Sequence, residues 1–595
     1  MEAKARAFTF LGDEGMVKIP FFQRAYVWKK DNWEDLLEDL CELEKTHFLG
    51  SLILKQQEPK TGEAKEVLVI DGQQRLTTLT VLLKAIYDQF DDELKENSKN
   101  EVIKYMFYKK YATDKLYLVK INHSRIDAQY FSKVIGKVQD KCISKISDIE
   151  FNEIGDNSNR ILQCYKYFYT ELFNKPYETK VKLFNNILNT ENKIIVLIDL
   201  MKNDNEQSIF DTINSAGVRL SGTDIVKNAL FQKALDLMDN SEAIDLYNNY
   251  WENIFNKNDE SVIFWSSQKS TGRLMRDNSE ILLQSIAVIK EIFDPDKHTL
   301  SELPDLYKET FEKLDKDGII QLIKEIYEYA NIYKNNISDF EISSLFSYEN
   351  NLERVLHILY VCELSTFHPY ILFLIKKYDD KEILYKKLKS LECFIIKRMI
   401  LRLETKSYNK LCKEFINDEN AIENRLKTID NNQIKIELEF IGNKPATLLL
   451  FWIELYRRYN DVNQSVKELK YNYSLEHIMP QAWEEYWGDV PVYDLHDIII
   501  NDQDIAKNER YRKIYSLGNM TLLNSRLNTS LRNYILERKI EGDGRKKGIR
   551  KYSDLLITKE IIFSYDNGIN YWDERIINKR KKELESEILD IWNNS

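Results

Sequence analysis

The sequence predicts a multidomain, α-rich protein with an α+β N-terminal domain (1–230), a helical middle domain (231–445) and a C-terminal domain (446–595). Its 595 residues exceed what one hydrophobic core usually serves. The first 230 residues mix β-branched runs with amphipathic segments. From 231 to 445 the chain is rich in Leu, Ile, Tyr and Lys, with few glycines and no sustained alternation, which indicates helices.

Composition narrows the class of protein. A hydrophobic fraction of 43% and an aromatic fraction of 12% are typical of a folded chain. No apolar run approaches a membrane span and no signal-peptide core is present, so we expect no membrane association. The six cysteines form no CxxC pair, which argues against zinc knuckles and disulfides and predicts a cytoplasmic protein.

Charge is distributed unevenly along the chain. The net charge is −11, yet residues 501–552 contain thirteen Lys/Arg and six Asp/Glu. This basic segment predicts either a phosphate-contacting patch or a solvated loop, and charge alone favours neither.

In chain order, we expect a helix over 29–45, strands over 47–56, 66–71 and 192–200, and a helix after residue 72. The first helix has Asp31 or Asn32 as its cap. Its apolar face comprises Trp33, Leu36, Leu37 and Leu40.

The segment "IPFFQRAYVW" (19–28) is the first polar motif. Gln23, Arg24, Tyr26 and Trp28 interrupt an extended stretch. An arginine beside two large aromatic rings can bind a phosphate and stack on a base. An edge strand with alternately exposed residues is the alternative, and the segment alone favours that.

The second motif, "DGQQR" (71–75), follows a predicted strand. Gly72 permits a tight turn, and a helix that begins near Gln73 presents unpaired N–H groups to anions. Arg75 adds a guanidinium suited to phosphate oxygens, and the amides of Gln73 and Gln74 suit a base edge or a water. The chemistry predicts a phosphate site other than a Walker A loop.

The third motif, "SIFDTINSAGVRLSGTDIVKNALF" (208–231), predicts a helix that stops at Gly217 and a second helix capped by Ser221, with Asp224 at its N3 position. Helix capping does not account for the polar residues Asn214 and Lys227 in this motif.

These three motifs resemble the N-terminal domain of GmrSD-type restriction endonucleases, which is similar to the ParB/sulfiredoxin fold. The resemblance implies nucleotide binding and hydrolysis, with GTP or ATP as regulatory nucleotide, and sensing of modified DNA. The nucleotide-phosphate site would be formed by Asp71, Gly72, Gln73, Gln74 and Arg75. The DNA-sensing surface would include Gln23, Arg24, Tyr26 and Trp28.

The C-terminal region contains "YSLEHIMPQAW" (473–483) and "YSLGNMTLLNSRLNTSLRNYILERK" (515–539). In the second stretch Asn519, Asn528 and Asn533 fall on an expected turn and helix start, where several asparagines suggest ligation or bracing. A closing amphipathic helix is expected to serve packing, with Arg580 as its one polar member. Its stripe comprises Trp572, Ile576, Arg580, Leu584, Ile588 and Trp592.

This arrangement resembles the HNH (ββα-metal) nucleases in the variant carried by GmrSD-type proteins. The resemblance implies that His477 is the general base and that Glu476 and Asn528 bind Mg²⁺ or Mn²⁺. Asn519 would brace the loop that carries the histidine. Asn533 and Lys539 would steady the helix or hold the scissile phosphate.

Two features depart from the family pattern. His477 and Asn519 are forty-two residues apart, so residues 484–513 are expected to be an insertion, and its His496 is a competing base. The family often has Asp where this chain has Glu476.

Four functions stay open. The first is an NTP-regulated, metal-dependent DNA endonuclease of type IV-like restriction, acting on modified double-stranded DNA. The second is a phosphorothioate-dependent defence nuclease or nickase. The third is a nucleotide-hydrolysing, DNA-binding switch with an inactive HNH domain, and the fourth is an NTPase that acts on a protein partner. The intact nuclease motif favours the first two, and a homodimer stays open.

Overall fold

The computed structural model describes residues 2–42, 49–57, 61–123, 125–139, 142–200, 221–271, 274–338, 340–544 and 547–593. The chain divides into two compact units: unit 1 comprises residues 1–249 and 308–320, and unit 2 comprises residues 250–307 and 321–595. Within the described ranges, no helix has the length and apolar composition needed to cross a membrane. The functional division at 230 and 445 stays a prediction.

Unit 1 is built on a six-stranded mixed sheet with the order β1-β10-β3-β4-β2-β7. Its strands are β1 (Glu2–Arg6), β2 (Met16–Lys18), β3 (Ser51–Gln56), β4 (Glu66–Asp71), β7 (Ile121–Asn122) and β10 (Ile195–Leu200). The predicted strands over 47–56 and 66–71 are confirmed as the antiparallel pair β3–β4, and the predicted strand over 192–200 is β10, parallel to β3.

Alternation along the central strands gives the sheet two apolar faces. Leu52 and Leu54 of β3 join the large core of unit 1, whereas Ile53 joins a small cluster with Ile198 and Leu200. This is the period-two pattern of a strand covered on both faces.

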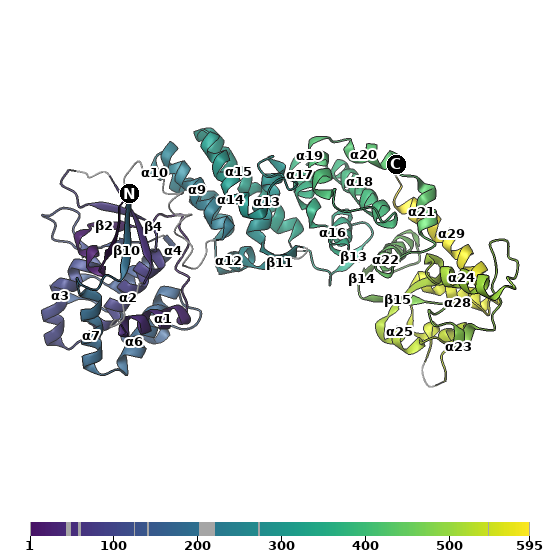
Figure 1. Cartoon of the computed structure of the whole chain (residues 1–595), viewed down its shortest axis with the longest axis horizontal. Coiled ribbons are helices and arrows are strands. Elements are labelled where there is room, and N and C mark those ends of the chain that lie inside the picture. The colour runs from purple at the N-terminus through teal and green to yellow at the C-terminus, as the bar shows by residue number, and fades with distance from the viewer. Residues whose placement is uncertain are drawn as a thin grey trace. The chain divides into compact units, whose positions relative to one another are not determined.

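Helices pack on the large core of unit 1, with α2 against α3, α6 and α7 (Figure 1). The longer helices are α1 (Lys30–Cys41), α2 (Gln73–Asp88), α3 (Asp92–Met106), α4 (Arg125–Ile135), α6 (Arg160–Phe173), α7 (Tyr177–Leu188) and α9 (Gly222–Leu237). The shorter elements are η1 (Phe8–Asp13), β5 (Phe107–Tyr108), β6 (Leu118–Val119), β8 (Val138–Gln139), β9 (Cys142–Ile143), α5 (Asp148–Glu153) and α10 (Asn240–Leu246).

Two sequence expectations for unit 1 need correction. The described segment 19–28 contains no strand. Its Ile19 N–H donates to the Asn122 carbonyl of β7 at the sheet edge, but farther along the Arg24 and Ala25 carbonyls accept from side chains of α2. Helix α1 begins at Lys30 with Lys29 as N-cap, and Asn32 accepts the Lys29 N–H at 3.1 Å instead of capping the helix itself. The predicted apolar face of α1 is confirmed as buried.

The first part of unit 2 is mainly helical, as predicted. Its elements are α11 (Asn253–Phe255), α12 (Asp259–Ser266), β11 (Gln268–Thr271), β12 (Leu274–Asp277), α13 (Asn278–Ile289), η4 (Leu300–Glu302), η5 (Tyr333–Ile337), β13 (Leu345–Ser347), α16 (Asn351–Cys362), η6 (Ser365–Phe367), α17 (His368–Lys377), α18 (Lys381–Ile400), α19 (Tyr408–Asn417), α20 (Ala421–Lys427) and α21 (Asn431–Glu437). Three further helices contain residues of both units: η3 (Tyr247–Glu252), α14 (Leu303–Lys313) and α15 (Lys316–Ile332).

The C-terminal part of unit 2 surrounds a two-stranded antiparallel ribbon, β15–β16. Helices α22 and α28 pack on β16, and α29 packs on the short η7 that precedes it (Figure 1). The elements are α22 (Asn443–Asn460), β14 (Glu468–Lys470), β15 (Tyr473–His477), α23 (Glu484–Trp487), α24 (Gln503–Ile514), η7 (Leu517–Asn519), β16 (Met520–Asn524), α25 (Ser525–Leu531), α26 (Leu536–Glu541), α27 (Ile549–Tyr552), α28 (Leu556–Asp566) and α29 (Glu574–Ile591).

Candidate functional site

Gly72 makes the turn from β4 into α2 with a backbone that few other residues would adopt. Its φ is 87°, in the left-handed region that favours glycine. A Cβ atom at this position would lie 2.8 Å from Leu52 Cδ1 and 2.9 Å from the Ser51 carbonyl oxygen. Helix α2 has no side-chain cap, so the N–H groups of its first turn face the turn unpaired among the described residues.

The glutamine side chains of the second motif brace the first motif. Gln73 Nε2 donates to the Arg24 carbonyl at 2.9 Å, and Gln74 Nε2 donates to the Ala25 carbonyl at 3.1 Å. Gln74 Oε1 accepts the Val27 N–H at 2.9 Å. Both glutamine side chains are buried, so their amides hold a loop, and the expectation that they read a base edge does not fit this structure.

Gln23 and Tyr26 also face inward. Gln23 Nε2 donates to the Val69 and Ile70 carbonyls of β4 at 2.7 and 3.1 Å. Tyr26 is 3% exposed, and its hydroxyl lies 2.6 Å from Thr78 Oγ1. A ring buried this deeply cannot stack on a base, which corrects its placement on the DNA-sensing surface.

The partners of Tyr26 carry no recognisable motif. Trp33 Nε1 donates to the Tyr26 hydroxyl at 2.9 Å, and the Tyr26 N–H donates to Asp127 at 2.6 Å. Trp28 is partly buried and packs against the same core. Of the four proposed DNA-sensing residues, Arg24 is the one with a charged side chain, and it acts electrostatically on Asp71 and Asp224.

Charged groups gather around the turn. Burial raises the pKa of the Asp71 carboxyl, against the opposing effects of the Gly72 N–H and the Arg75 and Arg24 guanidinium groups. Arg75 Nη1 donates to the Ser51 carbonyl at 3.2 Å, and its guanidinium packs on Gly50, where a Cβ would lie 2.5 Å from Arg75 Nε. A guanidinium has five N–H donors, and among the described residues one Arg75 donor bonds to a carbonyl oxygen.

The third motif contributes two more charges. Ser221 caps α9 as predicted, accepting the Asp224 N–H at 3.1 Å, and Lys227 Nζ donates to Asp224 at 2.9 Å. Burial would raise the pKa of Asp224, but Lys227, Ser221 and Arg24 together lower it. Arg24 therefore lies near the acidic groups of both other motifs. Asn214, Gly217 and Arg219 lie outside the described residues.

We call Arg24, Asp71, Arg75, Asp224 and Lys227 the N-terminal polar site. Three motifs separated by some two hundred residues converge there. The site has three cations and two carboxylates, with the first turn of α2 at its base.

In unit 2, the two predicted C-terminal stretches form a ribbon followed by a helix. Strands β15 and β16 pair antiparallel, with Glu476 opposite Thr521 and His477 opposite Met520, and α25 begins directly after β16. Asn519 lies in the turn η7 and Asn528 in the first turn of α25, as expected, whereas Asn533 follows that helix. Residues 520–524 between them form β16, which packs on α22 and α28.

Asn519 is fully buried and bonds across to the loop that follows His477. Its Oδ1 accepts the Met479 N–H at 2.8 Å, and its Nδ2 donates to the Met479 carbonyl at 2.9 Å. Nδ2 also donates to the Ile514 carbonyl at 3.0 Å. These are the contacts of a residue that braces the histidine-bearing loop.

His477 is partly buried at the end of β15. Neither ring nitrogen bonds to a described residue, and Nε2 is enclosed. Burial, with a smaller contribution from the neighbouring Lys539 ammonium, lowers the pKa of His477 to about 4. The imidazole is therefore neutral at pH 7 and has a lone pair available to accept a proton.

Glu476 and Lys539 form a buried ion pair beside it. Lys539 Nζ donates to Glu476 Oε1 at 2.6 Å and to the His477 carbonyl at 2.9 Å, and Lys539 is fully buried. Burial raises the pKa of Glu476 against the attraction of Lys539. Lys539 thus fixes one carboxylate oxygen, which leaves Oε2 without a hydrogen-bond partner in the described part of the chain.

Asn528, on α25, is oriented by the strand beside it. Its Nδ2 donates to the Leu475 carbonyl at 2.8 Å and to Ser474 Oγ at 3.0 Å, which leaves Oδ1 for another partner. Among the described residues, no three His, Cys, Asp or Glu side chains are grouped to hold a metal. A hard cation bound through Glu476 Oε2, Asn528 Oδ1 and several waters fits this donor set. We call Glu476, His477, Asn519, Asn528 and Lys539 the C-terminal polar site.

Asn533 and His496 lie outside this hydrogen-bond network. Asn533 follows α25 and makes no side-chain hydrogen bond to a described residue. His496 is exposed in the loop between α23 and α24, and its N–H donates to Asp494 at 2.8 Å. The inserted segment also carries α24, whose Arg510 forms a fully buried ion pair with Glu574 of α29 at 2.9 Å.

Arg580 is a supporting residue whose function the sequence analysis did not identify. It was expected to serve packing, and it is buried, but its guanidinium also bonds to the backbone around Asn519. Nη1 donates to the Gly518 and Met520 carbonyls at 3.1 and 2.6 Å. Gly518 itself packs so closely on α29 that a Cβ would lie 2.1 Å from the Ile577 carbonyl oxygen. The signal in the sequence that could have identified this function is the position of Arg580 as the one polar residue in an apolar helical stripe.

The basic segment 501–552 is less available to phosphate than its composition indicates. Several of its cations pair with acids, among them Arg510, Arg512, Lys513, Arg538, Lys539 and Arg550. The exposed cations of the segment that form no ion pair in the described ranges are Lys507, Arg526, Arg532, Lys547 and Lys551. Arg526 and Arg532 lie at the two ends of α25, which carries Asn528.

Two family models match this chain, one in its N-terminal part and one in its C-terminal part. Residues 8–231 match the family model of the GmrSD restriction endonuclease N-terminal domain, and residues 428–586 match that of the GmrSD restriction endonuclease C-terminal domain. The chain is also 28% identical, over 253 residues, to a protein of Methanocaldococcus jannaschii described as uncharacterized. That match covers 38% of this chain and 40% of the archaeal protein.

Each family model covers one of the two polar sites. The first contains all three N-terminal motifs, and the second contains both strands of the ribbon and α25. The two matches together support a GmrSD-type protein, because the chain is similar to that family in both its N-terminal and its C-terminal part.

Proposed function

We propose that the chain is an NTP-regulated, divalent-metal-dependent DNA endonuclease that cleaves modified foreign DNA. The GmrSD matches support a nuclease of a restriction system that acts on DNA. The observation that carries the finer proposal is the C-terminal polar site. At that site an imidazole whose ring nitrogens have no hydrogen-bond partner among the described residues follows Glu476 on a two-stranded ribbon, and Asn528 lies on the helix after the ribbon.

Each residue of the C-terminal polar site has a part in the proposed reaction. His477 accepts the proton of the attacking water, because its pKa is well below 7 and its lone pair is not used by a described residue. Asn519 holds the loop after the imidazole, and Lys539 holds the Glu476 carboxylate. Glu476 and Asn528 would hold Mg²⁺ or Mn²⁺, which when bound supplies neutralisation of charge at the scissile phosphate.

The N-terminal polar site supports nucleotide binding. The first turn of α2, whose N–H groups have no partner among the described residues, contains Arg75, and helix N–H groups and a guanidinium are both groups that bind phosphate oxygens. Arg24 and Lys227 add positive charge there, and Asp71 is a carboxyl whose pKa burial raises, as is common for groups that accept a proton from water. We infer that GTP or ATP is held with its phosphates at this turn.

DNA would follow the exposed cations near α25. Arg526 and Arg532 are exposed at the ends of the helix that carries Asn528, and long-range attraction by such cations is the main source of affinity for a phosphate backbone.

One experiment tests the proposal. The full-length chain is incubated with plain, hydroxymethylated, glucosylated or phosphorothioated double-stranded DNA, with Mg²⁺, Mn²⁺ or EDTA, and with GTP, ATP or no nucleotide. We expect cleavage of a modified substrate only with metal, and faster cleavage with one nucleotide. Selective cleavage of DNA that lacks phosphorothioate, in the presence of phosphorothioated DNA, would favour the phosphorothioate-dependent system instead. Metal-independent cleavage, or no cleavage of any substrate, would contradict the proposal.

A further inference from the structure

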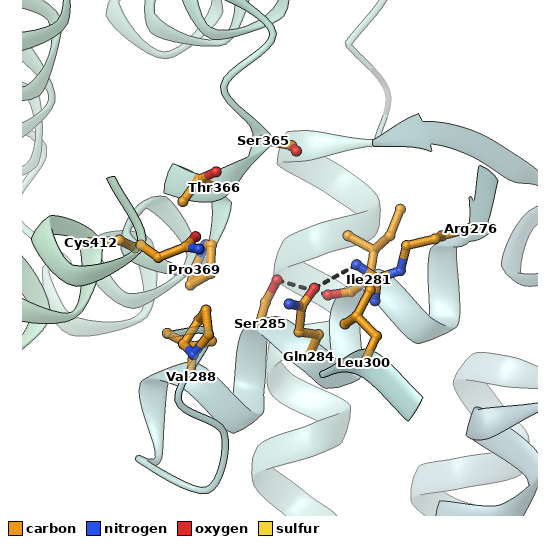
Figure 2. Close-up of a pocket in the computed structure, with 12 residues that line it drawn as sticks. Arg276, Ile281, Gln284, Ser285, Val288, Leu300, Ser365, Thr366, Pro369 and Cys412 are labelled. Carbon is orange, nitrogen blue, oxygen red and sulfur yellow. Dashed lines mark hydrogen bonds between the residues drawn. The ribbon is translucent and has the colours of Figure 1, made fainter. Parts of the chain in front are cut away.

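A cavity of about 310 Å³ lies in the helical part of unit 2 and is lined by none of the residues of either polar site. Its walls come from β12, one face of α13, the turn that begins α17, and α19 (Figure 2). The volume is at the lower end of the range of pockets that bind small organic molecules.

Arg276, from β12, is the charged group of this cavity. The residue is 6% exposed, and Figure 2 shows its side chain extending toward Gln284 of α13. Nη1 donates to Gln284 Oε1 at 2.5 Å, and Nη2 donates to the Glu280 carbonyl at 3.2 Å. Nε is enclosed and has no hydrogen-bond partner in the described part of the chain. The Glu280 carboxylate lies 3.5 Å from Nε, close enough for an ion pair but without a hydrogen bond.

Other polar groups of the cavity wall also lack partners. The side chains of Ser365, Thr366 and Asn409 make no hydrogen bond to a described residue, and each is partly buried. Ser365 and Thr366 form the turn that begins α17, where the partial positive charge of a helix N-terminus lies. Unpaired, partly buried polar groups around one cavity are typical of a ligand site.

We propose that this cavity binds a small organic anion. Its carboxylate or phosphate group would take the place of Glu280 at Arg276 Nε, because the Glu280 side chain is 29% exposed and can turn toward solvent. Its apolar body would pack on Ile281, Val288 and Leu300. A bound anion relieves the cost of burying a guanidinium with one unsatisfied edge. Burial also lowers the pKa of Arg276, although the Glu280 and Asp277 carboxylates oppose this effect.

Binding of three probes to the full-length chain tests the proposal. Phenyl phosphate and benzoate carry an anionic group on a ring that suits the cavity, and benzamide is the neutral counterpart of benzoate. We expect at least one anion to raise the thermal unfolding midpoint and to bind measurably by calorimetry, and benzamide to bind at least about tenfold more weakly. The stronger of the two anions distinguishes a phosphate ligand from a carboxylate ligand.

Variants locate the binding. Arg276→Gln should weaken the preferred anion at least about tenfold, since a charge-assisted hydrogen bond is lost. Ser285→Leu should weaken anion binding to the same extent, because the larger side chain fills the cavity while the guanidinium stays in place. If Arg276→Gln does not fold, the affinity of Ser285→Leu for the anion tests the proposal. Lys406→Gln removes an exposed charge of the same unit and should bind as the unmodified chain does.

Three results would overturn the proposal: no midpoint shift with either anion, equal binding of benzamide, or unchanged anion binding in folded Arg276→Gln or Ser285→Leu. An anion that binds at the N-terminal polar site instead would give this last result, because neither substitution alters that site.

Discussion

The N-terminal and C-terminal polar sites both contain side-chain amides that look available in the sequence and that the structure uses as braces. Gln73 and Gln74 hold the loop of the first motif, and Asn519 holds the loop after His477. The groups around these braces differ in kind. At the N-terminal site they are three cations and two carboxylates near backbone N–H groups that have no partner among the described residues, whereas at the C-terminal site they are a neutral imidazole, an ion pair and an amide oxygen.

This difference separates two kinds of phosphate chemistry. Cations and N–H groups bind an anionic ligand directly, so the N-terminal site suits retention of a nucleotide. An imidazole with carboxylate and amide oxygens suits a cation and proton transfer, so the C-terminal site suits hydrolysis of a phosphodiester. The predictions below test this division from the largest expected effect to the smallest.

Replacing His477 should have the largest effect. His477→Ala is expected to lower the DNA cleavage rate about 10²- to 10⁴-fold, because the general base is removed, and to leave nucleotide hydrolysis unchanged. Cleavage is followed on a labelled duplex under single-turnover conditions. His496→Ala is the matched control, since it removes an exposed histidine of the insertion. If His496→Ala lost cleavage while His477→Ala remained active, His496 would be the general base and His477 would not.

Breaking the buried ion pair should destabilise unit 2. Lys539→Met leaves the Glu476 carboxylate buried and unpaired, which costs about 3–5 kcal/mol of unfolding free energy. Chemical denaturation measures the change. Lys551→Met removes an exposed lysine nearby in sequence and should change stability by less than about 0.5 kcal/mol. Equal effects of the two substitutions would show that the pair contributes nothing to the fold.

The Gly72 turn is tested by comparing two glycines of unit 1. Gly62 has a φ of 80° and no described atom within 4 Å of the place that a Cβ would take, whereas a Cβ on Gly72 would clash with Leu52 and Ser51. Gly62→Ala should cost about 1–2 kcal/mol from backbone strain alone. Gly72→Ala should cost about 1–3 kcal/mol more because of overpacking, and it should also slow nucleotide hydrolysis. Equal costs would contradict the close approach of β3 to the turn.

Removing Arg75 should affect nucleotide chemistry alone. Arg75→Ala is expected to lower nucleotide hydrolysis about ten- to a hundredfold through loss of charge-assisted hydrogen bonds, with intrinsic stability nearly unchanged. A malachite green assay with GTP and with ATP measures phosphate release. Arg160→Ala, in the same unit, is the control. Unaltered turnover in Arg75→Ala would remove the guanidinium from the phosphate site.

The smallest effect concerns the charge state of His477. Its folded pKa, about 4, is below the ordinary value of about 6.5, so its neutral burial stabilises the fold above pH 6.5. This contribution is lost as pH falls from about 6.5 toward 4. In EDTA, His477→Gln should therefore gain about 1 kcal/mol relative to the unmodified chain between pH 7.5 and 5.5. A constant difference across that range would show that the imidazole is not buried.

Sequence reasoning predicted the elements whose signal is local. The strand pair 47–56 and 66–71, the apolar face of α1, the Ser221 cap and the closing helix all follow from period, capping residue and glycine position. It was wrong about the segment 19–28, where an alternating pattern predicted a strand. The backbone there is held by Gln73 and Gln74, which lie some fifty residues away.

For the candidate sites, the sequence located the residues but not their orientation. Tyr26 is a residue type that can stack on a base, yet Thr78, Trp33 and Asp127 hold it in the core. Of these three, the sequence predicted burial for Trp33, and nothing in the sequence indicated that it would bond to Tyr26. The sequence likewise gives the net charge of the segment 501–552 but not the acidic residues elsewhere in the chain that pair with its cations. Glu574, which pairs with Arg510, is one of them. Which polar groups remain free depends on long-range pairing that composition does not contain.

The contact between Gly518 and the last helix has a genetic consequence. The backbone beside Asn519 rests on Ile577 and Arg580 of α29, with no room for even a methyl group between Gly518 and Ile577. A premature stop before codon 577 would remove both contacts and leave every codon of unit 1 intact. Such a late lesion should therefore abolish the proposed cleavage and spare the proposed nucleotide binding, although a survey that scores coding length alone would pass it as nearly intact.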